Sequence, residues 1–430
     1  RCERAVKLPL AFGRLNPHRA DGMRLVIPLA ALVPFGLLPI QARAESTEAR
    51  GLQFAAFHSL AKFNRSAGNN EQERVFTSPE IATRIRWDEL IASWNVELPS
   101  DGGLKVEVRA IYPERATKWY TLGLWSADPA KHPRASVRQQ KDADGDVATD
   151  TLLLKKPAQR VQARLTFIGK TKPKIKFFGL SLLDTAARPE PLPPNRAAWG
   201  ITLPVPERSQ MNYENGGVLC SPTTVSMLLS YWSGQRKRPD LDRDVPEVVS
   251  GVFDPRWDGT GNWVFNTAYA GSLPGMRAYT ARLSDVAELE DWIARGIPVG
   301  LSVCYNRLRG LSRTPSGHLV VCVGFTAAGD AVINDPGTSK NVRKMKVLLH
   351  PKMVDMTKPV TIRAIRVRTE NEPRAVMSRA ISRAQGGPIG TSGRPATRRL
   401  SSTAWSKARL SPSNTTSSTR LRDRKSTRLN

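Results

Sequence analysis

A thiol stands at the start of a predicted helix in the second half of the chain. In the segment GGVLCSPTTVSMLLSYW, residues 216–232, Cys220 precedes Ser221, a good helix cap, and Pro222, which suits the first helical position. The apolar residues that follow form one stripe at helical spacing: Val225, Leu228, Leu229 and Trp232. Gly234 would end the helix. Cys220 would then lie just before the positive end of the helix, where a reactive thiolate is stabilised, whereas an inert core cysteine would sit on the stripe itself. Position alone leaves both interpretations open.

A nucleophilic thiol needs a base, and the segment SGHLVVCVGF offers His318 at the start of an apolar strand. A turn at TAAGD and a second strand, AVINDPG, follow it. A tight hairpin around residues 328–329 would pair Asp335 with Cys322. Asp335 would then share the face of His318, while Asn334 would point to the other face. Alternation therefore selects Asp335 as the carboxylate that orients the histidine, although a bulge or twist must bring the two together. The alternative is a strand-end histidine bonded only to backbone.

Residues from about 90 to 183 alternate apolar and polar side chains, as half-buried strands do. Several such segments with turns between them predict an antiparallel β-sandwich over residues 45–186. Residues 187–200 are rich in proline and predict a linker, and a second domain follows over residues 201–368. The predicted fold class is therefore α+β, with the N-terminal antiparallel β-sandwich followed by the domain that holds the thiol.

One acidic turn within the predicted sandwich resembles a calcium loop. KDADGD, residues 141–146, offers Asp142, Asp144 and Asp146, but it lacks the downstream bidentate Glu of a full loop. A hydrated hairpin turn is the favoured interpretation. The chain has no C-x-x-C or H-E-x-x-H spacing, so neither a metal ion nor another cofactor is expected.

The two ends of the chain differ from its middle. Residues 23–44 have the layout of a secretory signal, with an apolar run over residues 25–40 before Ala42-Arg43-Ala44. We therefore expect residues 1–22 to be an over-extended reading frame and the mature protein to be secreted or periplasmic, with no membrane span after signal cleavage. A membrane anchor is the alternative, but the run is short for a span. Residues 369–430 predict a disordered and partly artefactual tail, because they lack hydrophobic periodicity.

Charge and cysteine content limit the partners. The net charge of +27 stays positive when both ends are left out, but the cations are scattered through predicted strands, so nucleic acid is not an expected partner. Without its leader the chain keeps three cysteines, an odd number that leaves at least one thiol unpaired in an oxidising compartment. Cys304 and Cys322 lie in apolar segments and are expected to be buried thiols, with a disulfide between them as the alternative.

Four blocks in the second domain resemble a known family. SQMNYENGGVLCSPTTVSMLLSYW, GNWVFNTAYAG, GHLVVCVGF and INDPG look like the bacterial papain-like cysteine peptidases related to the double-glycine leader peptidases. The resemblance implies a papain-like fold, with Cys220 as nucleophile, His318 as base and Asp335 as its orienting residue. It also implies Gln210 as the side chain of the oxyanion hole, a place where acyl transfer needs a preorganised donor. Trp263 and Asn266 match the family and could wall the cleft or simply begin a core helix.

The chain differs from the leader-processing members of this family in one respect. The leader-processing peptidases are fused to transporters, whereas this chain shows no membrane domain, so cleavage of double-glycine leaders is not carried over. The expected activity is hydrolysis of a peptide or isopeptide bond through a thioester. Two alternatives are a cell-wall peptide amidase or acyltransferase that uses the same residues, and an inactive peptidase-like protein that binds a peptide or, at the sandwich, a glycan.

Overall fold

The computed structural model describes residues 50–170, 172–308, 317–338, 344–347 and 362–369. The predicted over-extended reading frame, 1–22, and the predicted signal segment, 23–44, lie outside the described residues, as does the predicted tail beyond residue 369. The described residues belong to one compact unit of the chain. No helix among them is both long and apolar enough to cross a membrane.

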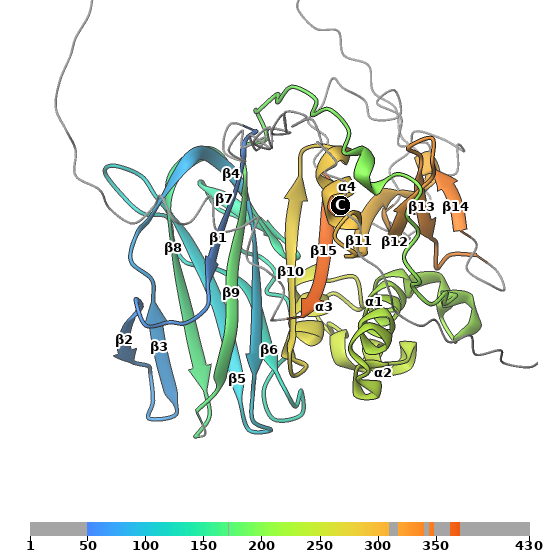
Figure 1. The fold of residues 1–430 in the computed structure, drawn as a ribbon. Coiled ribbons are helices and arrows are strands. Elements are labelled where there is room, and N and C mark those ends of the chain that lie inside the picture. Colours follow the sequence, from blue (N-terminus) through green and yellow to red (C-terminus); the bar gives the residue numbers. More distant parts are fainter. Residues whose placement is uncertain (1–49, 171, 309–316, 339–343, 348–361, 370–430) are drawn as a thin grey trace, which may run out of the picture. The chain divides into compact units, whose positions relative to one another are not determined.

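The N-terminal part is an antiparallel sheet whose strands are drawn from blue to green in Figure 1. Its strands are β1 (Leu52–Phe57), β2 (Asn64–Ala67), β3 (Glu73–Thr77), β4 (Ile81–Glu97), β5 (Gly103–Ile111), β6 (Tyr120–Ser126), β7 (Gly145–Ala148), β8 (Thr151–Ile168) and β9 (Lys174–Leu183). The main path through the sheet runs β1-β9-β4-β8-β3-β2, with β5 and β7 also paired to β8 and β6 paired to β5.

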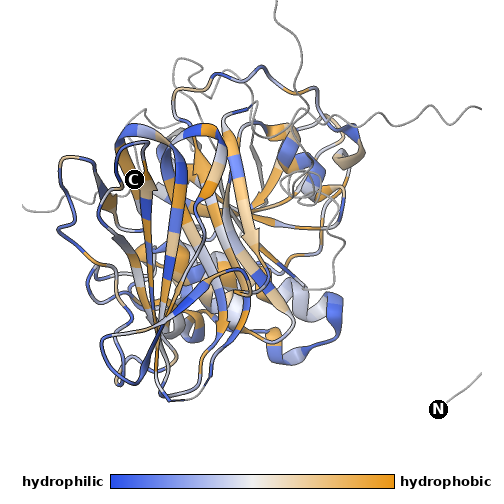
Figure 2. Cartoon of the chain, turned by 90° about the vertical axis from the view of Figure 1, so that its left-hand side faces the viewer, coloured by the Kyte–Doolittle hydropathy of each residue, from blue (hydrophilic) through white to orange (hydrophobic). Residues whose placement is uncertain are grey.

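Two long strands make this sheet continuous. β4 pairs with β8 along its first part and with β9 along its second, and its register shifts twice against β8 and once against β9. Such irregularities bend a strand and increase its twist, so the sheet curls upon itself. The sequence predicted several short strands in a sandwich. The structure has one curled antiparallel sheet that contains short strands, such as β2 and β7, beside the long strands β4 and β8, and the sandwich stays a prediction. The predicted alternation is visible as bands of hydrophilic and hydrophobic colour along its strands in Figure 2.

The C-terminal part holds a second antiparallel sheet, ordered β10-β15-β11-β12-β13-β14. Its strands are β10 (Met276–Leu283), β11 (Val299–Cys304), β12 (Gly317–Phe325), β13 (Ala331–Asn334), β14 (Lys344–Val347) and β15 (Ile362–Thr369). The helices are α1 (Cys220–Arg236), α2 (Val245–Val252), α3 (Trp263–Ser272), α4 (Val286–Ile293) and α5 (Tyr305–Leu308). Short 3₁₀ helices are η1 (Arg196–Ala198), η2 (Gln210–Asn212), η3 (Gly216–Val218) and η4 (Pro239–Leu241). Sheets and helices together give the α+β class that the sequence predicted.

Helix α1 differs from its prediction at both ends. It begins at Cys220, so Ser221 lies inside the helix and caps nothing, and it ends at Arg236, two residues beyond Gly234. The cap at its end is Lys237, in the left-handed conformation with φ 52°. The helix is also buried around its whole circumference over residues 221–232, because β12 packs on one side while α2 and α3 pack on others. A helix enclosed in this way needs no polar face, so the single apolar stripe is not its organising feature.

A buried amide joins the two parts of the chain. Asn95 of β4 is fully buried, and its side chain donates to the Ala278 carbonyl at 2.7 Å and accepts from the Ala278 N–H at 3.0 Å. A Cβ on Gly271 of α3 would stand 2.0 Å from the Asn95 amide nitrogen, so only glycine permits this approach. The hydrophobic core continues across the same region, where Trp94 packs edge-on against Phe265.

The proline-rich connection over residues 187–200 is held by helix α4. The Asn195 side chain donates to Asp291 at 2.6 Å, and the Trp199 indole donates to Glu290 at 2.9 Å. The Leu192 N–H donates to Asp285 at 2.9 Å. These bonds fix the path of the connection over α4, so it is more than a spacer between the predicted domains.

Candidate active site

Cys220 is the first residue of α1 and is only partly buried. The residue before it, Leu219, caps the helix without any side-chain hydrogen bond. The first N–H groups of a helix have no partners within the helix, and the helix dipole is positive at this end. The Cys220 thiol therefore stands next to backbone donors that could hold a developing negative charge.

His318 and Asp335 form the centre of the site. His318 is 6% exposed and follows the first residue of β12, while Asp335 is fully buried and directly follows β13. The His318 Nε2 atom lies 2.7 Å from Asp335 Oδ1. The same carboxylate oxygen accepts the Gly337 N–H at 2.8 Å. The pair that strand alternation selected is thus joined by a short, buried hydrogen bond.

The charge state of His318 is set by opposing influences. Burial alone would lower the pKa of His318, but its hydrogen bonds with Asp335 and Cys220, and the negative charges of those two groups, raise that pKa to about 9. The histidine is therefore an imidazolium at neutral pH, bonded to Asp335 and within electrostatic reach of the Cys220 thiol. An imidazolium next to a thiol favours a thiolate–imidazolium pair.

The hairpin that unites His318 with Asp335 differs in register from the prediction. The sequence expected Cys322 opposite Asp335, but Cys322 pairs with Ile333, and the last pair joins Val321 to Asn334. The loop tip is displaced by one residue, and an irregularity between Cys322 and Gly324 adds a second one-residue shift. A single shift would have turned Asp335 to the opposite face, and two shifts restore it. The predicted pairing was wrong by two residues, and the predicted face was right.

Gln210 is placed close to the Asp335 segment. Its side chain is 4% exposed, and its backbone N–H donates to the Pro336 carbonyl at 2.9 Å. Its side-chain Nε2 donates to the Gly216 carbonyl at 2.6 Å, in the turn that leads to Cys220. An amide nitrogen carries two N–H groups, so this bond leaves the second one for another acceptor. The structure thus links the Gln210 loop to both Asp335 and the approach to Cys220.

Two residues that sequence analysis did not select complete the site. The Tyr305 ring, at the start of α5, packs on the His318 imidazole with 4.3 Å between ring centroids. Gly337 leaves little space, because a Cβ there would stand 3.1 Å from Asp335 Oδ1, 3.1 Å from the Tyr305 hydroxyl and 3.2 Å from the His318 ring. Tyr305 carries no recognisable signal in the sequence, and Gly337 lies in the quoted INDPG block, which does not indicate what packs against it.

The remaining candidates have structural places. Asn266 of α3 is buried and donates to the carbonyls of Thr260 and Asn262, and Trp263 is buried at the start of the same helix. Of the two interpretations given to these residues, their contacts match the start of a core helix. Cys304 and Cys322 lie on neighbouring strands, but Cys304 pairs with Gly317 while Cys322 pairs with Val299. No disulfide joins them, so the preference for thiols over a disulfide is confirmed, but only Cys322 is buried as expected, whereas Cys304 is half-buried.

The acidic turn of the N-terminal sheet is occupied by basic and phenolic partners. Asp144 accepts two hydrogen bonds from the Arg115 guanidinium, at 2.5 and 2.7 Å. Asp142 accepts the Tyr120 hydroxyl at 2.6 Å and lies 3.2 Å from the Lys118 ammonium. These contacts fit the hairpin-turn interpretation of KDADGD. In the described part of the chain, no three His, Cys, Asp or Glu side chains gather closely enough to hold a metal ion.

Comparison with known families identifies both parts of the chain. A family model described as "Peptidase C39 N-terminal domain" matches residues 42–181, and one described as "Peptidase_C39 like family" matches residues 202–354. The second match contains Gln210, Cys220, His318 and Asp335. No curated protein matches the chain.

Proposed function

Because the chain belongs to the C39 family of cysteine peptidases, we propose that it is an exported, papain-like enzyme that hydrolyses a peptide or isopeptide bond through a thioester on Cys220. The contact that carries this proposal is the His318–Asp335 pair, in which the imidazole Nε2 lies 2.7 Å from a fully buried carboxylate, while the Cys220 thiol is near enough to help raise the pKa of His318. A thiol, a base and an orienting acid in this order are the parts that nucleophilic acyl transfer requires.

Acylation begins with the thiolate–imidazolium pair. The Cys220 sulfur attacks the carbonyl carbon of the scissile bond, and the carbonyl oxygen takes the negative charge of the tetrahedral intermediate. As the intermediate collapses, the bond to nitrogen breaks and His318 gives its proton to the leaving amine. The products of this half-reaction are the free amine, a Cys220 thioester and a neutral imidazole.

Deacylation restores the enzyme. The neutral His318 takes a proton from a water molecule while the water oxygen attacks the thioester carbonyl. The second tetrahedral intermediate expels the Cys220 thiolate and releases the carboxylic acid product, which leaves His318 protonated again. Asp335 keeps its charge throughout, because its part is to hold the imidazole and to stabilise its protonated form.

The oxyanion needs donors on the side of the intermediate away from His318. We assign this part to the backbone N–H at the start of α1 and to the second N–H of the Gln210 amide. The Gly216 carbonyl holds that amide at 2.6 Å and so fixes its orientation before substrate arrives. A donor that is already oriented costs no reorganisation during the reaction, which is the source of its effect on rate.

A peptide pool from a digested proteome tests the activity, because it offers many different peptide bonds at once. The parent protein is expected to generate new amino termini, and Cys220→Ala is expected to generate none above background. Cys304→Ala is the matched control, because it removes a different half-buried thiol and should cleave like the parent. Equal cleavage by the parent and Cys220→Ala would contradict the proposal.

The chemical class of the substrate is a separate question. Wall-derived peptides should be tested beside the proteome pool, since release of amines from wall peptides alone would favour the amidase alternative. The proposed export rests on the signal-like layout of residues 23–44, and N-terminal sequencing of protein recovered from culture medium or periplasm checks it. An intact leader on all recovered protein would contradict export with cleavage.

A further inference from the structure

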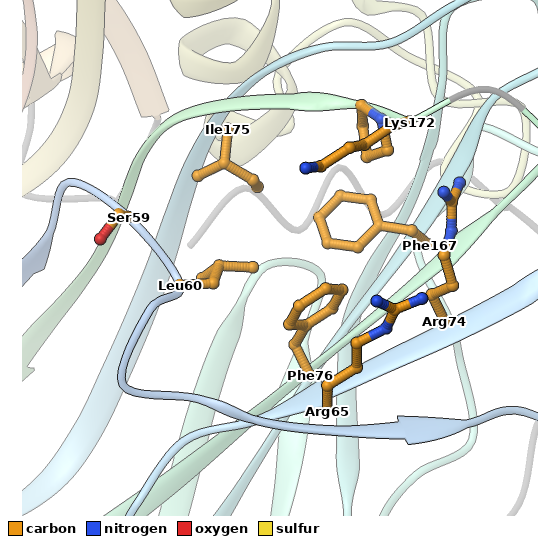
Figure 3. A pocket seen from close by; sticks show the side chains of 9 residues that line it. Ser59, Leu60, Arg65, Arg74, Phe76, Phe167, Lys172 and Ile175 are labelled. Carbon is orange, nitrogen blue, oxygen red and sulfur yellow. The ribbon is translucent and has the colours of Figure 1, made fainter.

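A hollow of about 430 Å³ opens on the N-terminal sheet, away from every residue of the proposed active site (Figure 3). The volume is in the range of sites that hold a small molecule or one end of a chain. Its apolar lining comes from two rings, Phe76 and Phe167, and from Leu60, Pro173 and Ile175. The two rings pack edge-on with 5.7 Å between their centroids.

Cross-strand register explains why cations stand beside these rings. Arg65 of β2 is directly opposite Phe76 of β3, and Arg74 of β3 is directly opposite Phe167 of β8. Directly opposed residues of antiparallel strands point to the same face, as do residues two apart on one strand. These four side chains therefore share one face of the β2-β3-β8 ribbon.

The hollow is strongly basic. Arg65, Arg74 and Lys172 line it, and no Asp or Glu does. Neither Arg65 nor Lys172 makes an ion pair with any residue that the structure describes, and both side chains are exposed. Arg74 donates to the Gly169 carbonyl at 3.0 Å, which fixes the position of its guanidinium. Glu73, the nearest acid on β3, alternates to the other face and accepts the Asn69 N–H at 2.8 Å.

We propose that this hollow binds a small carboxylate that carries an apolar body. The body would lie against Phe76 and Phe167, and the carboxylate would accept from the cations at the rim, where Arg can bond both of its oxygens. A neutral glycan, the ligand considered from the sequence, fits less well, because Ser59 is the only neutral polar side chain in the lining. The proposal rests on the N-terminal sheet alone and does not depend on the peptidase activity.

Two sources could supply such a ligand, the C-terminal end of a peptide and a fatty acid. The probes are N-acetylphenylalanine for the first and octanoate for the second, titrated calorimetrically into the full-length protein at low salt. We expect a dissociation constant on the order of 1 mM or tighter for at least one probe, as small ligands of this size allow. Tighter binding of N-acetylphenylalanine assigns the peptide source, and tighter binding of octanoate assigns the fatty acid.

Charge and site are tested separately. N-acetylphenylalanine amide keeps the apolar body without the charge, and we expect it to bind at least about fivefold more weakly than the acid. Arg65→Gln and Lys172→Gln should each weaken the binding of N-acetylphenylalanine by a similar factor. Lys170→Gln is the matched control, because Lys170 is also exposed and lies two residues before Lys172 but does not line the hollow.

Three results would overturn the proposal. The first is that neither probe binds at about 10 mM, which is ten times the expected dissociation constant. The second is that the acid and its amide bind with equal affinity. The third is that Lys170→Gln weakens binding of the acid as much as Arg65→Gln does. In any of these cases the cations serve only to keep an edge strand soluble, a common use of charge at sheet edges.

Discussion

Replacing Asp335 with Asn separates the charge of this residue from its geometry. The Asp335 Oδ1 atom accepts from His318 at 2.7 Å and from the Gly337 N–H at 2.8 Å, and the carbonyl oxygen of Asn can accept both bonds. The substitution therefore keeps the orientation of the imidazole and removes the buried negative charge beside it. Asp335→Ala removes the acceptor as well as the charge and is the matched comparison.

The size of the effect follows from the pKa of His318. Loss of an opposite charge at hydrogen-bond distance typically lowers the pKa of a histidine by about 1–3 units, which is about 1.4–4 kcal/mol. The pKa of His318 in the parent is raised to about 9. With a decrease of about two units, the protonated fraction of His318 at pH 8 would fall from about nine-tenths to about one-tenth. The rate should then fall about tenfold at pH 8 and change little at pH 6.

The rate of labelling by a vinyl sulfone that carries a short peptide measures this pH dependence without a known substrate. Its reaction consumes a thiolate and takes up a proton, so the labelling rate follows the thiolate–imidazolium pair. In the parent, the rate should fall above about pH 9, where His318 loses its proton. In Asp335→Asn this fall should move to lower pH, and Asp335→Ala should be slow at every pH. An alkaline fall at the same pH in the parent and Asp335→Asn would refute the assigned charge effect.

Three further substitutions test the surroundings of the site and the junction of the chain. Gly337→Ala would push on three site groups at 3.1–3.2 Å, so we expect about a tenfold lower labelling rate with unchanged melting temperature; an unchanged rate would contradict the close packing. Tyr305→Ala removes the ring that packs on the imidazole at 4.3 Å and should slow labelling severalfold, while Tyr305→Phe should not; equal loss in both would show that the ring is not the cause. Asn95→Ala leaves the buried Ala278 N–H and carbonyl without partners, at a cost of about 2–4 kcal/mol, and should lower the melting temperature by about 5 °C or more. A melting temperature equal to that of an exposed control, Asn69→Ala, would argue against the junction as a source of stability.

Much of the site could be predicted because it depends on local patterns. A cysteine before a run of helix-forming residues indicated the start of α1, and strand alternation selected Asp335 over Asn334 as the partner of His318. Alternation survives a shift of two residues, so the correct face was predicted from an incorrect register. The family implied by the four sequence blocks is confirmed by the two family matches.

The remainder depends on contacts between segments that are distant in the sequence. Tyr305 reaches His318 only because β11 and β12 are neighbours in the second sheet, and no local pattern reveals that pairing. The bond from Asn95 to Ala278 joins residues 183 positions apart. The full burial of α1 was hidden for the same reason, since its enclosure by α2 and α3 is a property of packing and not of its own sequence. The predicted domain boundaries and the catalytic roles stay predictions.

Mass spectrometry of the intact protein after reaction with the peptidyl vinyl sulfone tests the central claim most directly. The account predicts one adduct per chain, mapped to Cys220 after digestion, that disappears in Cys220→Ala and persists in Cys304→Ala. His318→Ala should react at least about a hundredfold more slowly, because the thiolate loses its imidazolium partner. An adduct on Cys304 or Cys322 in place of Cys220, or full labelling of Cys220→Ala, would contradict the claim that Cys220 is the nucleophile.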